Sequence, residues 1–287
     1  MRLVVFGYGF SGRTLARRLL AEHWSVTAIV RNPATAEIVA ADGARPVDIA
    51  DPEAVAGAVI GAQALLITAP PGPLGCPGLT TVGLVLTQAR PNWIGYLSTT
   101  GVYGDRRGGW VTERSSLAAQ SVEAARRVGA ERDWLALGAT GGQTVTIFRL
   151  PGIYGPGRSP LDRIRNGRAR RITVAEQVFS RIHVDDLAAG LAASIRRPRA
   201  GGIYNLCDDE PAPNSEVVAY GARLLGLPVP PEVALADARL PPSALRFYAE
   251  TKRVSNALAK AELGWRPAFP NYRQGLRAVL DAEVKPR

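Results

Sequence analysis

Leu3-Val4-Val5-Phe6-Gly7-Tyr8-Gly9-Phe10-Ser11-Gly12 is the stretch that decides the fold of this 287-residue chain. Its first four residues are an apolar run typical of a buried strand, and residues 13–21 follow with a helical pattern. The glycines between them have the spacing Gly-x-Gly-x-x-Gly. That spacing indicates a tight turn at Gly7, close approach of the backbone to a ligand at Gly9, and close packing of helix on strand at Gly12.

A strand, this glycine spacing and a helix in immediate succession predict a Rossmann dinucleotide site. The free N–H groups at the start of the helix and its positive dipole end would receive the phosphates. The cofactor-binding residues expected in this loop are Gly7, Gly9, Phe10, Ser11 and Gly12. A glycine-rich turn without a ligand is the alternative.

Composition sets the class of protein. A hydrophobic content of 46% is enough for a full core, and the length suits one large α/β domain with an appended lobe, or two domains. No apolar run is long enough to span a membrane, and the first strand begins too early for a signal peptide. Two cysteines form no disulfide framework and only two histidines occur, so we expect a cytoplasmic protein without a metal site.

The net charge is +10, and nearly all of the positive charge is arginine because only three lysines occur. An anionic ligand or nucleic acid would explain this charge, and so would arginine-biased codon usage. The densest cluster comprises Arg163, Arg165, Arg168, Arg170 and Arg171. No aromatic residues interleave with it, so we expect no nucleic acid, and either a solvated face or a clamp for a substrate phosphate.

Strands and helices alternate through the first half of the chain. Strands are expected at 25–30, 46–47, 64–68, 93–97 and 145–150, and helices at 34–41, 53–59, 79–88 and 119–137. Asn32-Pro33 and Asp51-Pro52 each pair an N-cap residue with proline at the first helical position. The alternation predicts an α/β fold, a doubly wound parallel Rossmann sheet with helices on both faces.

Beyond Pro151 the composition changes, and proline and glycine become dense. We expect a Rossmann domain over 1–155, with 181–210 returning to the sheet through a helix starting near Asp186 and a strand at 203–206. Residues 156–180 and 211–287 would then form a smaller C-terminal substrate lobe with long loops.

Several motifs coincide in order along the chain. They are Leu-Ser-Thr-Thr-Gly-Val-Tyr-Gly at 97–104, Phe-Arg-Leu-Pro-Gly-Ile-Tyr-Gly-Pro-Gly at 148–157, Ile-His-Val-Asp-Asp-Leu-Ala at 182–188, and shorter matches at 203–205, 252–256 and 263–265. Over essentially the whole chain this pattern resembles the extended short-chain dehydrogenase/reductase superfamily, the group of nucleoside-diphosphate-sugar epimerases and dehydratases. The resemblance implies a Rossmann domain that binds NAD or NADP and a C-terminal lobe for a small-molecule substrate.

The resemblance also implies roles for single residues. Thr99 falls where the family keeps its catalytic Ser or Thr, although a strand-end hydroxyl bonded to backbone is the alternative. The remaining matches are Thr68, Ala69 and Pro70 near the nicotinamide ribose, Pro151, Gly152 and Ile153 near the nicotinamide, and Asp48 facing the adenine.

Arg31, at the end of the second strand, favours NADP over NAD. NAD sites usually place Asp or Glu there for the ribose hydroxyls, whereas a guanidinium can pair with a 2′-phosphate. Arg13 could help to hold a phosphate in the same way. The alternative is that Arg31 is a solvent-facing loop residue.

The superfamily's Tyr-x-x-x-Lys pair is missing, because no tyrosine lies between Tyr103 and Tyr154 and no lysine precedes Lys252. With Glu131 as the anchor of the motif, Glu123 takes the Tyr position and Arg127 the Lys position. We expect these two to form an i,i+4 ion pair on the helix surface rather than an acid–base pair, because arginine stays protonated.

Tyr103 or Tyr154 could deliver a catalytic hydroxyl instead, or each could fix its own loop. The family's Arg-x-x-Ile/Val-His-Val pattern is also altered, because Arg181 lies two places nearer to His183. We expect His183, with Asp185 and Asp186, to be structural, a strand end followed by a helix cap. Cys76, in the proline-rich loop 70–77, is a thiol without the features of an activated nucleophile.

These features predict an NADP-dependent oxidoreductase or epimerase-like enzyme with a rearranged proton donor, acting on a carbonyl or sugar-type small molecule. An NADP-binding sensor or regulator, and a catalytically silent subunit that uses the cofactor for stability, are the alternatives. The chain would be a monomer, or a homodimer paired through 119–137.

Overall fold

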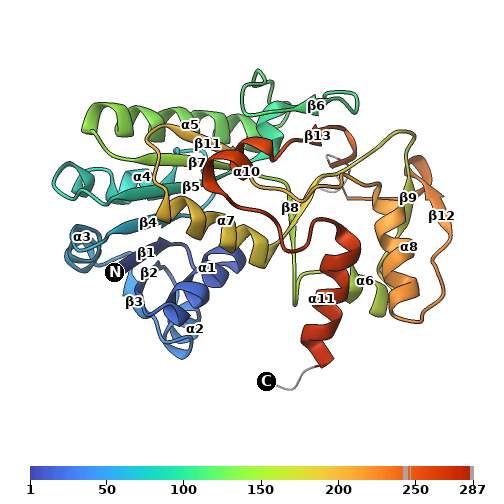
Figure 1. Cartoon of the computed structure of the whole chain (residues 1–287), viewed down its shortest axis with the longest axis horizontal. Helices are drawn as coiled ribbons and strands as arrows, with labels where there is room; N and C mark the ends of the chain where they lie inside the picture. The colour runs from blue at the N-terminus through green and yellow to red at the C-terminus, as the bar shows by residue number, and fades with distance from the viewer. Residues whose placement is uncertain (242–244, 246, 285–287) are drawn as a thin grey trace.

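A computed structural model describes residues 1–241, 245 and 247–284. Residues 242–244, 246 and 285–287, which belong to the expected C-terminal lobe, lie outside these. The centre of the structure is a parallel sheet of seven strands in the order β11-β7-β5-β4-β1-β2-β3 (Figure 1). The strands are β1 Arg2–Phe6, β2 Ser25–Val30, β3 Arg45–Asp48, β4 Ala64–Ile67, β5 Trp93–Thr99, β7 Val145–Leu150 and β11 Gly202–Asn205. The doubly wound Rossmann sheet expected from the sequence is thereby confirmed.

Helices cover both faces of the sheet. On one face lie α1 Phe10–Ala21, α2 Pro33–Ala41, α7 Val184–Arg196 and α10 Ala257–Leu263; on the other lie α3 Pro52–Ile60, α4 Pro77–Val82 and α5 Val122–Gly141. Successive residues of each strand point to opposite faces of the sheet, and each face has its own hydrophobic core. Leu3 and Val5 pack against the first group of helices, and Val4 and Phe6 pack against the second. Burial on both faces explains why the strands are apolar runs rather than alternating ones.

Local sequence signals fix two of these helices. Asn32 accepts a hydrogen bond from Thr35 N at 2.7 Å, and Asp51 accepts one from Ala54 N at 2.9 Å, so both expected N-caps are confirmed. The helix expected at 79–88 is instead divided into α4 and a short 3-10 turn, η1 Val85–Thr87. The break is at Gly83, the residue that follows α4, because glycine is a poor helix former.

The long helix begins and ends later than expected. Ser121 caps it through a hydrogen bond from Ala124 N at 3.1 Å, and it continues to Gly141, where Gly142 adopts a left-handed conformation. The expected start at 119 is too early because Ala119 continues a helical pattern ahead of the Ser121 cap. The expected end at 137 is too early because Gly138 does not stop the helix, which ends at the left-handed Gly142.

The C-terminal lobe is smaller and packs against the carboxyl end of the sheet (Figure 1). Its elements are β8 Gly152–Tyr154, α6 Pro160–Arg165, β9 Arg171–Thr173, β10 Arg181–His183, α8 Asn214–Leu224, β12 Glu232–Ala234, η3 Leu235–Asp237 and α11 Tyr272–Val284. β8 pairs with β10 and β9 with β12, all parallel. A separate pair joins β6 Trp110–Val111 to β13 Arg253–Val254. Tyr154, Leu161, Val217, Tyr272 and Leu276 form the lobe's own small core.

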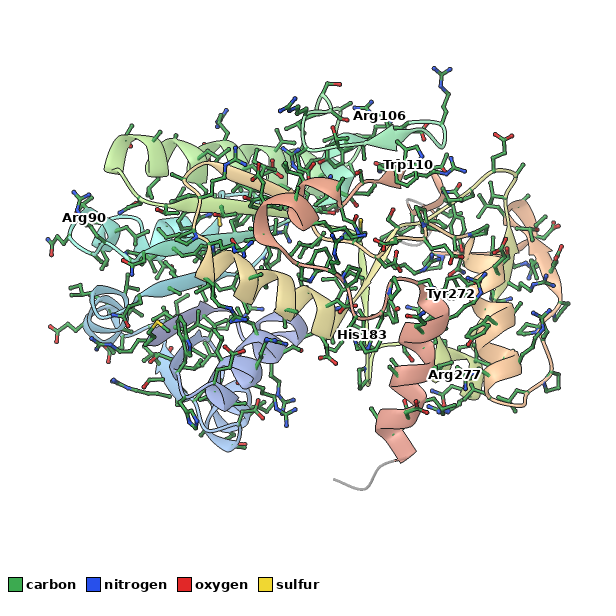
Figure 2. The ribbon with its side chains drawn as sticks, in the orientation of Figure 1. Arg90, Arg106, Trp110, His183, Tyr272 and Arg277 are labelled. Carbon is green, nitrogen blue, oxygen red and sulfur yellow. The ribbon has the colours of Figure 1, made fainter. Side chains whose placement is uncertain are left out.

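His183 has the structural role expected of it, but the cap is made differently. α7 begins at Val184 rather than near Asp186, and the Nδ1 atom of His183 accepts a hydrogen bond from Asp185 N at 3.2 Å. Asp186 instead accepts hydrogen bonds from the backbone N–H groups of Ala268 and Phe269, at 2.7 and 3.0 Å. Figure 2 shows His183 between the sheet domain and α11, at the junction of the two parts.

Among the described residues, no helix has the length and apolar character needed to cross a membrane. The same residues contain no group of three or more His, Cys, Asp or Glu side chains arranged to hold a metal ion.

Candidate functional site

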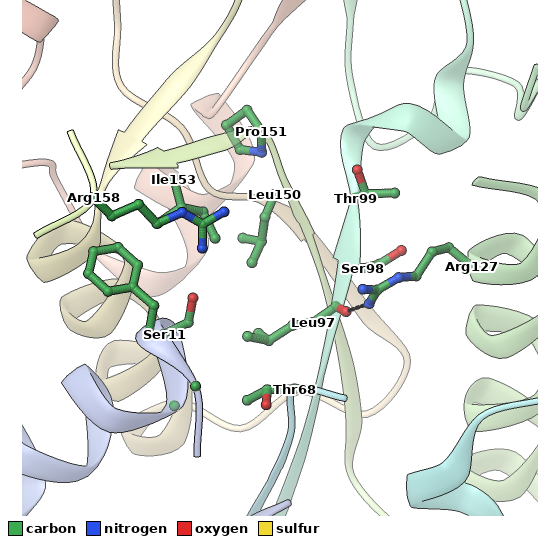
Figure 3. Close-up of a pocket in the computed structure, with 13 residues that line it drawn as sticks. Ser11, Thr68, Leu97, Ser98, Thr99, Arg127, Leu150, Pro151, Ile153 and Arg158 are labelled. Carbon is green, nitrogen blue, oxygen red and sulfur yellow. Dashed lines mark hydrogen bonds between the residues drawn. The ribbon is translucent and has the colours of Figure 1, made fainter. Parts of the chain in front are cut away.

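A cavity of about 310 Å³ lies at the carboxyl edge of the central sheet (Figure 3). It is lined by Gly9, Phe10, Ser11, Gly12, Thr68, Leu97, Ser98, Thr99, Arg127, Leu150, Pro151, Ile153 and Arg158. The chain order of the sheet reverses between β1 and β4, and the loops that follow these two strands contribute Gly9 and Thr68. Ligands of open α/β sheets bind at such a switch point.

Each glycine of the loop after β1 has its own geometric reason. Gly7 has φ +95°, and a Cβ atom there would lie 2.6 Å from Thr68 Oγ1. A Cβ atom on Gly12 would lie 2.7 Å from the Gly7 carbonyl oxygen and 2.9 Å from Val5 Cγ1. Gly9 differs, because a Cβ atom there would meet nothing within 4 Å. Gly7 and Gly12 are therefore required by packing, whereas Gly9 leaves open the space beside the N-terminus of α1 where a diphosphate fits.

Thr68 fixes this loop from the neighbouring strand. Its hydroxyl donates to the Gly7 carbonyl at 2.7 Å, which holds the turn against the end of β4. Of the other residues expected around the cofactor, Pro151 and Ile153 line the cavity, whereas Ala69, Pro70 and Gly152 are outside its lining.

Arg31 and Asp48 lie at the same edge of the sheet but away from the cavity. Arg31 is exposed beyond the end of β2, directly before the Asn32 cap of α2. Asp48 ends β3 opposite Val30 and accepts a hydrogen bond from Ala50 N at 2.9 Å. These positions suit the adenosine end of a dinucleotide whose diphosphate lies at Gly9.

Arg13 already has a partner. Its guanidinium binds both oxygens of Asp42, at 2.5 and 2.9 Å, and the Tyr8 hydroxyl donates to the same carboxylate at 3.2 Å. The hydrogen bonds from Arg13, together with its charge, lower the pKa of Asp42, so the carboxylate stays ionised. Arg13 thus links α1 to the C-terminus of α2 rather than presenting its charge to a phosphate.

Thr99, the last residue of β5, faces the cavity (Figure 3). Its Oγ1 accepts a hydrogen bond from Gly101 N at 3.1 Å and so caps the 3-10 turn η2 Thr100–Tyr103. The hydroxyl proton is not used by that bond, so it can be donated to a ligand. Both roles considered for this residue, backbone cap and hydrogen-bond donor, are compatible.

A buried polar network supports the end of β5. Ser98 donates to Glu131 Oε1 at 2.5 Å, and Glu131 pairs with Arg149, whose Nη2 lies 2.7 Å from Oε2. Arg149 Nη1 also donates to the Tyr103 hydroxyl at 3.1 Å. The Ser98 proton is used by this network, so Thr99 is the cavity-lining hydroxyl of β5 whose proton can be donated to a ligand.

Arg127 corrects one expectation. It was expected to pair with Glu123 on the helix surface, but it lines the cavity and its Nη1 donates to the Leu97 carbonyl (Figure 3). The same nitrogen lies 3.5 Å from the Tyr96 hydroxyl. α5 packs on β5, and this packing turns Arg127 toward the strand end, whereas Glu123, one turn earlier, is exposed.

Neither tyrosine proposed as a proton donor lines the cavity. Tyr103 is fully buried, and its hydroxyl donates to Asn205 Oδ1 at 2.7 Å. Tyr154 points toward α11, where a Cβ atom on Gly275 would lie 1.8 Å from its hydroxyl oxygen. Burial raises the pKa of both phenols. The geometry therefore favours the alternative reading, in which each tyrosine fixes its own part of the structure.

The remaining candidates also lie outside the cavity. Cys76 is buried and accepts a hydrogen bond from Trp134 Nε1 at 3.4 Å. In the arginine cluster, Arg165 pairs with Glu283 at 2.5 Å and Arg171 with Glu232 at 2.8 Å. A second hollow of about 320 Å³ on α6 is lined by Asp162, Arg163, Asn166 and Arg168.

Sequence reasoning did not identify Arg158 as a cavity residue, and it placed Arg127 on a surface. Arg158 follows the Gly-Pro-Gly at 155–157, and only the fold brings that turn across to α1. Glu131 and Arg149 were likewise not seen as a pair. A buried strand with a single arginine at 149 was the one sequence feature that could have indicated a buried partner.

Comparison with known proteins gives consistent matches. Residues 7–146 match the family model described as NAD(P)H-binding. Protein YeeZ from Escherichia coli K12 is 31% identical over 246 residues, which cover 80% of this chain and 85% of that protein. The solved structure of a functionally unknown conserved protein from Silicibacter pomeroyi is 44% identical, with a TM-score of 0.90 and 98% of both chains covered. A dTDP-glucose 4,6-dehydratase double mutant from Streptomyces venezuelae, solved with NAD bound, is 25% identical, with a TM-score of 0.79 over 98% of this chain and 96% of that one.

Proposed function

The chain belongs to the NAD(P)-binding, epimerase/dehydratase-like group of the short-chain dehydrogenase/reductase superfamily, and from that premise we propose that it is an NADP-dependent oxidoreductase or epimerase-like enzyme acting on a carbonyl or sugar-type small molecule. One observation carries the proposal. A single cavity joins the open space at Gly9 to the hydroxyl of Thr99 at the end of β5.

The residues around Gly9 fit a dinucleotide. The backbone N–H groups at the start of α1 would bind the diphosphate, and Pro151 and Ile153 would form the wall beside the nicotinamide. A bound nicotinamide would supply the hydride acceptor or donor. Gly152 would lie next to the nicotinamide, and the segment Thr68, Ala69 and Pro70 would lie next to its ribose.

NADP is proposed in preference to NAD because of Arg31. It is exposed at the end of β2, where a guanidinium can pair with a 2′-phosphate through charge-assisted hydrogen bonds. Asn32 caps the N-terminus of α2 directly after it, so the positive N-terminal end of that helix adds to the attraction. Asp48, at the end of the adjacent strand, would face the adenine.

Thr99 and Arg127 are the side chains proposed to act on the substrate end. The Thr99 hydroxyl, held by Gly101 N, would donate a hydrogen bond to the oxygen that gains negative charge during reduction. Arg127 would hold the ribose hydroxyls and add a fixed positive charge beside that oxygen. The proton itself would come from a water molecule, since Tyr103 and Tyr154 lie outside the cavity.

Segments 156–180 and 211–287 are proposed as the substrate lobe. In support, α6, α8 and α11 form a core apart from the sheet, whereas α10 packs on the sheet face with α1 and α7. The buried, unpaired Cys76 and Cys207 fit a reducing cytoplasm. Either a monomer or a homodimer formed through α5 is consistent with the proposal.

Titration of the purified protein with NADPH and with NADH, followed by nicotinamide fluorescence, tests the cofactor. Tight NADPH binding with weak NADH binding supports the proposal, and no binding of either refutes it. A screen of carbonyl and sugar-nucleotide substrates with NADPH, repeated on Thr99→Ala and Thr99→Ser, tests the enzyme. Turnover that Thr99→Ala loses and Thr99→Ser keeps supports catalysis, whereas NADPH binding without any turnover favours the sensor alternative.

A further inference from the structure

Arg158 is the charged cavity residue that lies beside the glycine loop and the start of α1. It follows β8 in the chain, yet its guanidinium lies 5.6 Å from the centre of the Phe10 ring, at the first residue of α1. Figure 3 shows the guanidinium on the α1 side of the cavity near Ser11, across from Arg127. Residues far apart in sequence therefore meet at the N-terminus of α1.

The turn that carries Arg158 is fixed by its backbone. Gly155 N donates to the Arg158 carbonyl at 3.1 Å, and Arg158 N donates to the Gly155 carbonyl at 3.0 Å. Gly157 closes the turn with φ +75°. A Cβ atom on Gly155 would lie 2.6 Å from Val184 Cγ1 and 3.2 Å from Phe10 Cζ, so the turn is pressed against α1 and α7. The start of the Arg158 side chain is thus held in place.

The charge of the cavity points to an anion. Its 13 lining residues include two arginines, Arg127 and Arg158, and no aspartate or glutamate. Arg127 is engaged with the Leu97 carbonyl at the β5 end. Arg158 is exposed and rests on an aromatic face, an arrangement that orients a guanidinium while leaving its N–H groups directed to the sides.

We propose that Arg158 is a second anchor for the cofactor diphosphate, closing over it from the lobe side while the N-terminus of α1 binds it from below. This inference rests on the proposed dinucleotide function and adds a residue to it. The consequence is a link between the two parts of the protein, because the same turn leads directly into α6 through the Ser159 cap. Cofactor binding would then hold this part of the lobe against α1.

Arg158→Met tests the proposal, because methionine keeps an apolar stem over Phe10 and removes the charge. Arg223→Met is the matched control: it removes the same charge from an exposed position on α8, outside the residues that line this cavity. The probes are NADPH, NADH and adenosine 2′-monophosphate, the last of which has the 2′-phosphate but no diphosphate. Affinities come from fluorescence titration and, for the monophosphate, from competition with NADPH.

Arg158→Met is expected to weaken NADPH and NADH by the same factor, about tenfold or more, with the monophosphate unchanged and Arg158→Lys intermediate. An NADPH affinity within twofold of the wild type overturns the role of Arg158 and leaves the proposed function intact. An equal loss for the monophosphate also overturns it, because the effect would then be a general one of charge or folding. A wild-type protein that binds neither dinucleotide refutes the proposed function, and this inference with it.

Discussion

Arg149 and Glu131 form an ion pair inside the protein, with Nη2 2.7 Å from Oε2 and side chains that are 4% and 3% exposed. Arg149 comes from β7 and Glu131 from α5, so the pair joins the sheet to the helix that covers it. Both Nε contacts of Arg149 to the carboxylate oxygens measure 3.2 Å. Ser98 and Tyr103 complete the network, which therefore sets the positions of residues on either side of Thr99.

Glu131→Gln is expected to destabilise the fold by about 3–5 kcal/mol, because it leaves the Arg149 charge buried without its carboxylate. Urea denaturation followed by circular dichroism measures the change. The double variant Glu131→Leu/Arg149→Met removes both charges together and should recover a large part of the loss. If Glu131→Gln is as stable as the wild type, the Glu131 carboxylate is not needed to stabilise the buried Arg149 charge.

Gly9→Ala and Gly12→Ala are expected to separate binding from folding. Gly9 has φ −87°, which alanine adopts readily, and its methyl group would meet nothing within 4 Å, so stability should change by less than about 0.5 kcal/mol. NADPH affinity should nonetheless fall at least tenfold, because the methyl group would occupy the space proposed for the diphosphate. Gly12→Ala should instead destabilise the protein by about 1–3 kcal/mol, since its Cβ atom would lie 2.7 Å from the Gly7 carbonyl oxygen.

Thermal denaturation of the two variants measures the change in stability, and NADPH titration measures the change in cofactor affinity. If Gly9→Ala binds NADPH as well as the wild type, the diphosphate does not lie at this loop. A fully stable Gly12→Ala would mean that α1 can move away from β1 without cost.

The fold could be predicted from the sequence because its signals are local. The apolar run before Gly7 and the caps at Asn32 and Asp51 each act within a few residues, and the structure has a strand and two helices there. Helix boundaries were less accurate at 79–88, where Gly83 interrupts a pattern that otherwise continues. Residue spacing alone does not measure how much one glycine weakens a short helix.

The site was harder to predict because its decisive contacts are tertiary. Arg127 was placed on a surface since i,i+4 spacing suggests a partner on the same helix, but the packing of α5 on β5 turns it toward Leu97. Tyr103 is a candidate proton donor from the sequence alone. In the structure its hydroxyl donates at 2.7 Å to Oδ1 of Asn205, a residue about a hundred positions later in the chain. Motif matching located Thr99 at the cavity because the end of a strand is a local property.

Arg31→Ala is expected to weaken NADPH binding by about tenfold or more and NADH binding by less than twofold. The reason is that a charge-assisted contact to the 2′-phosphate exists only for NADPH. Increasing ionic strength should reduce the wild-type preference as well, because Arg31 is exposed and its charge is screened by salt. Fluorescence titrations at two salt concentrations measure both effects, and an equal loss for the two cofactors would contradict the assignment of NADP.

Asp208 is expected to make stability depend on pH. Its side chain lies in the core beyond β11, and burial raises its pKa to about 8, against the opposing influence of the Arg181 charge and the Glu210 backbone N–H. The unfolded chain has the ordinary value near 3.8, so between about pH 4 and pH 8 the folded state holds a proton that the unfolded state has lost. The free energy of unfolding should therefore fall as pH rises through this range, by up to about 1.4 kcal/mol per pH unit.

Asp208→Asn keeps the shape of the side chain and removes the titration, so its stability should fall less than that of the wild type between pH 5 and pH 8. Asp237→Asn, at an exposed position, is the control and should follow the wild-type profile. Urea denaturation at each pH gives the three curves. Parallel curves for the wild type and Asp208→Asn would mean that Asp208 is ionised in the folded protein, with Arg181 stabilising its charge more than burial opposes it.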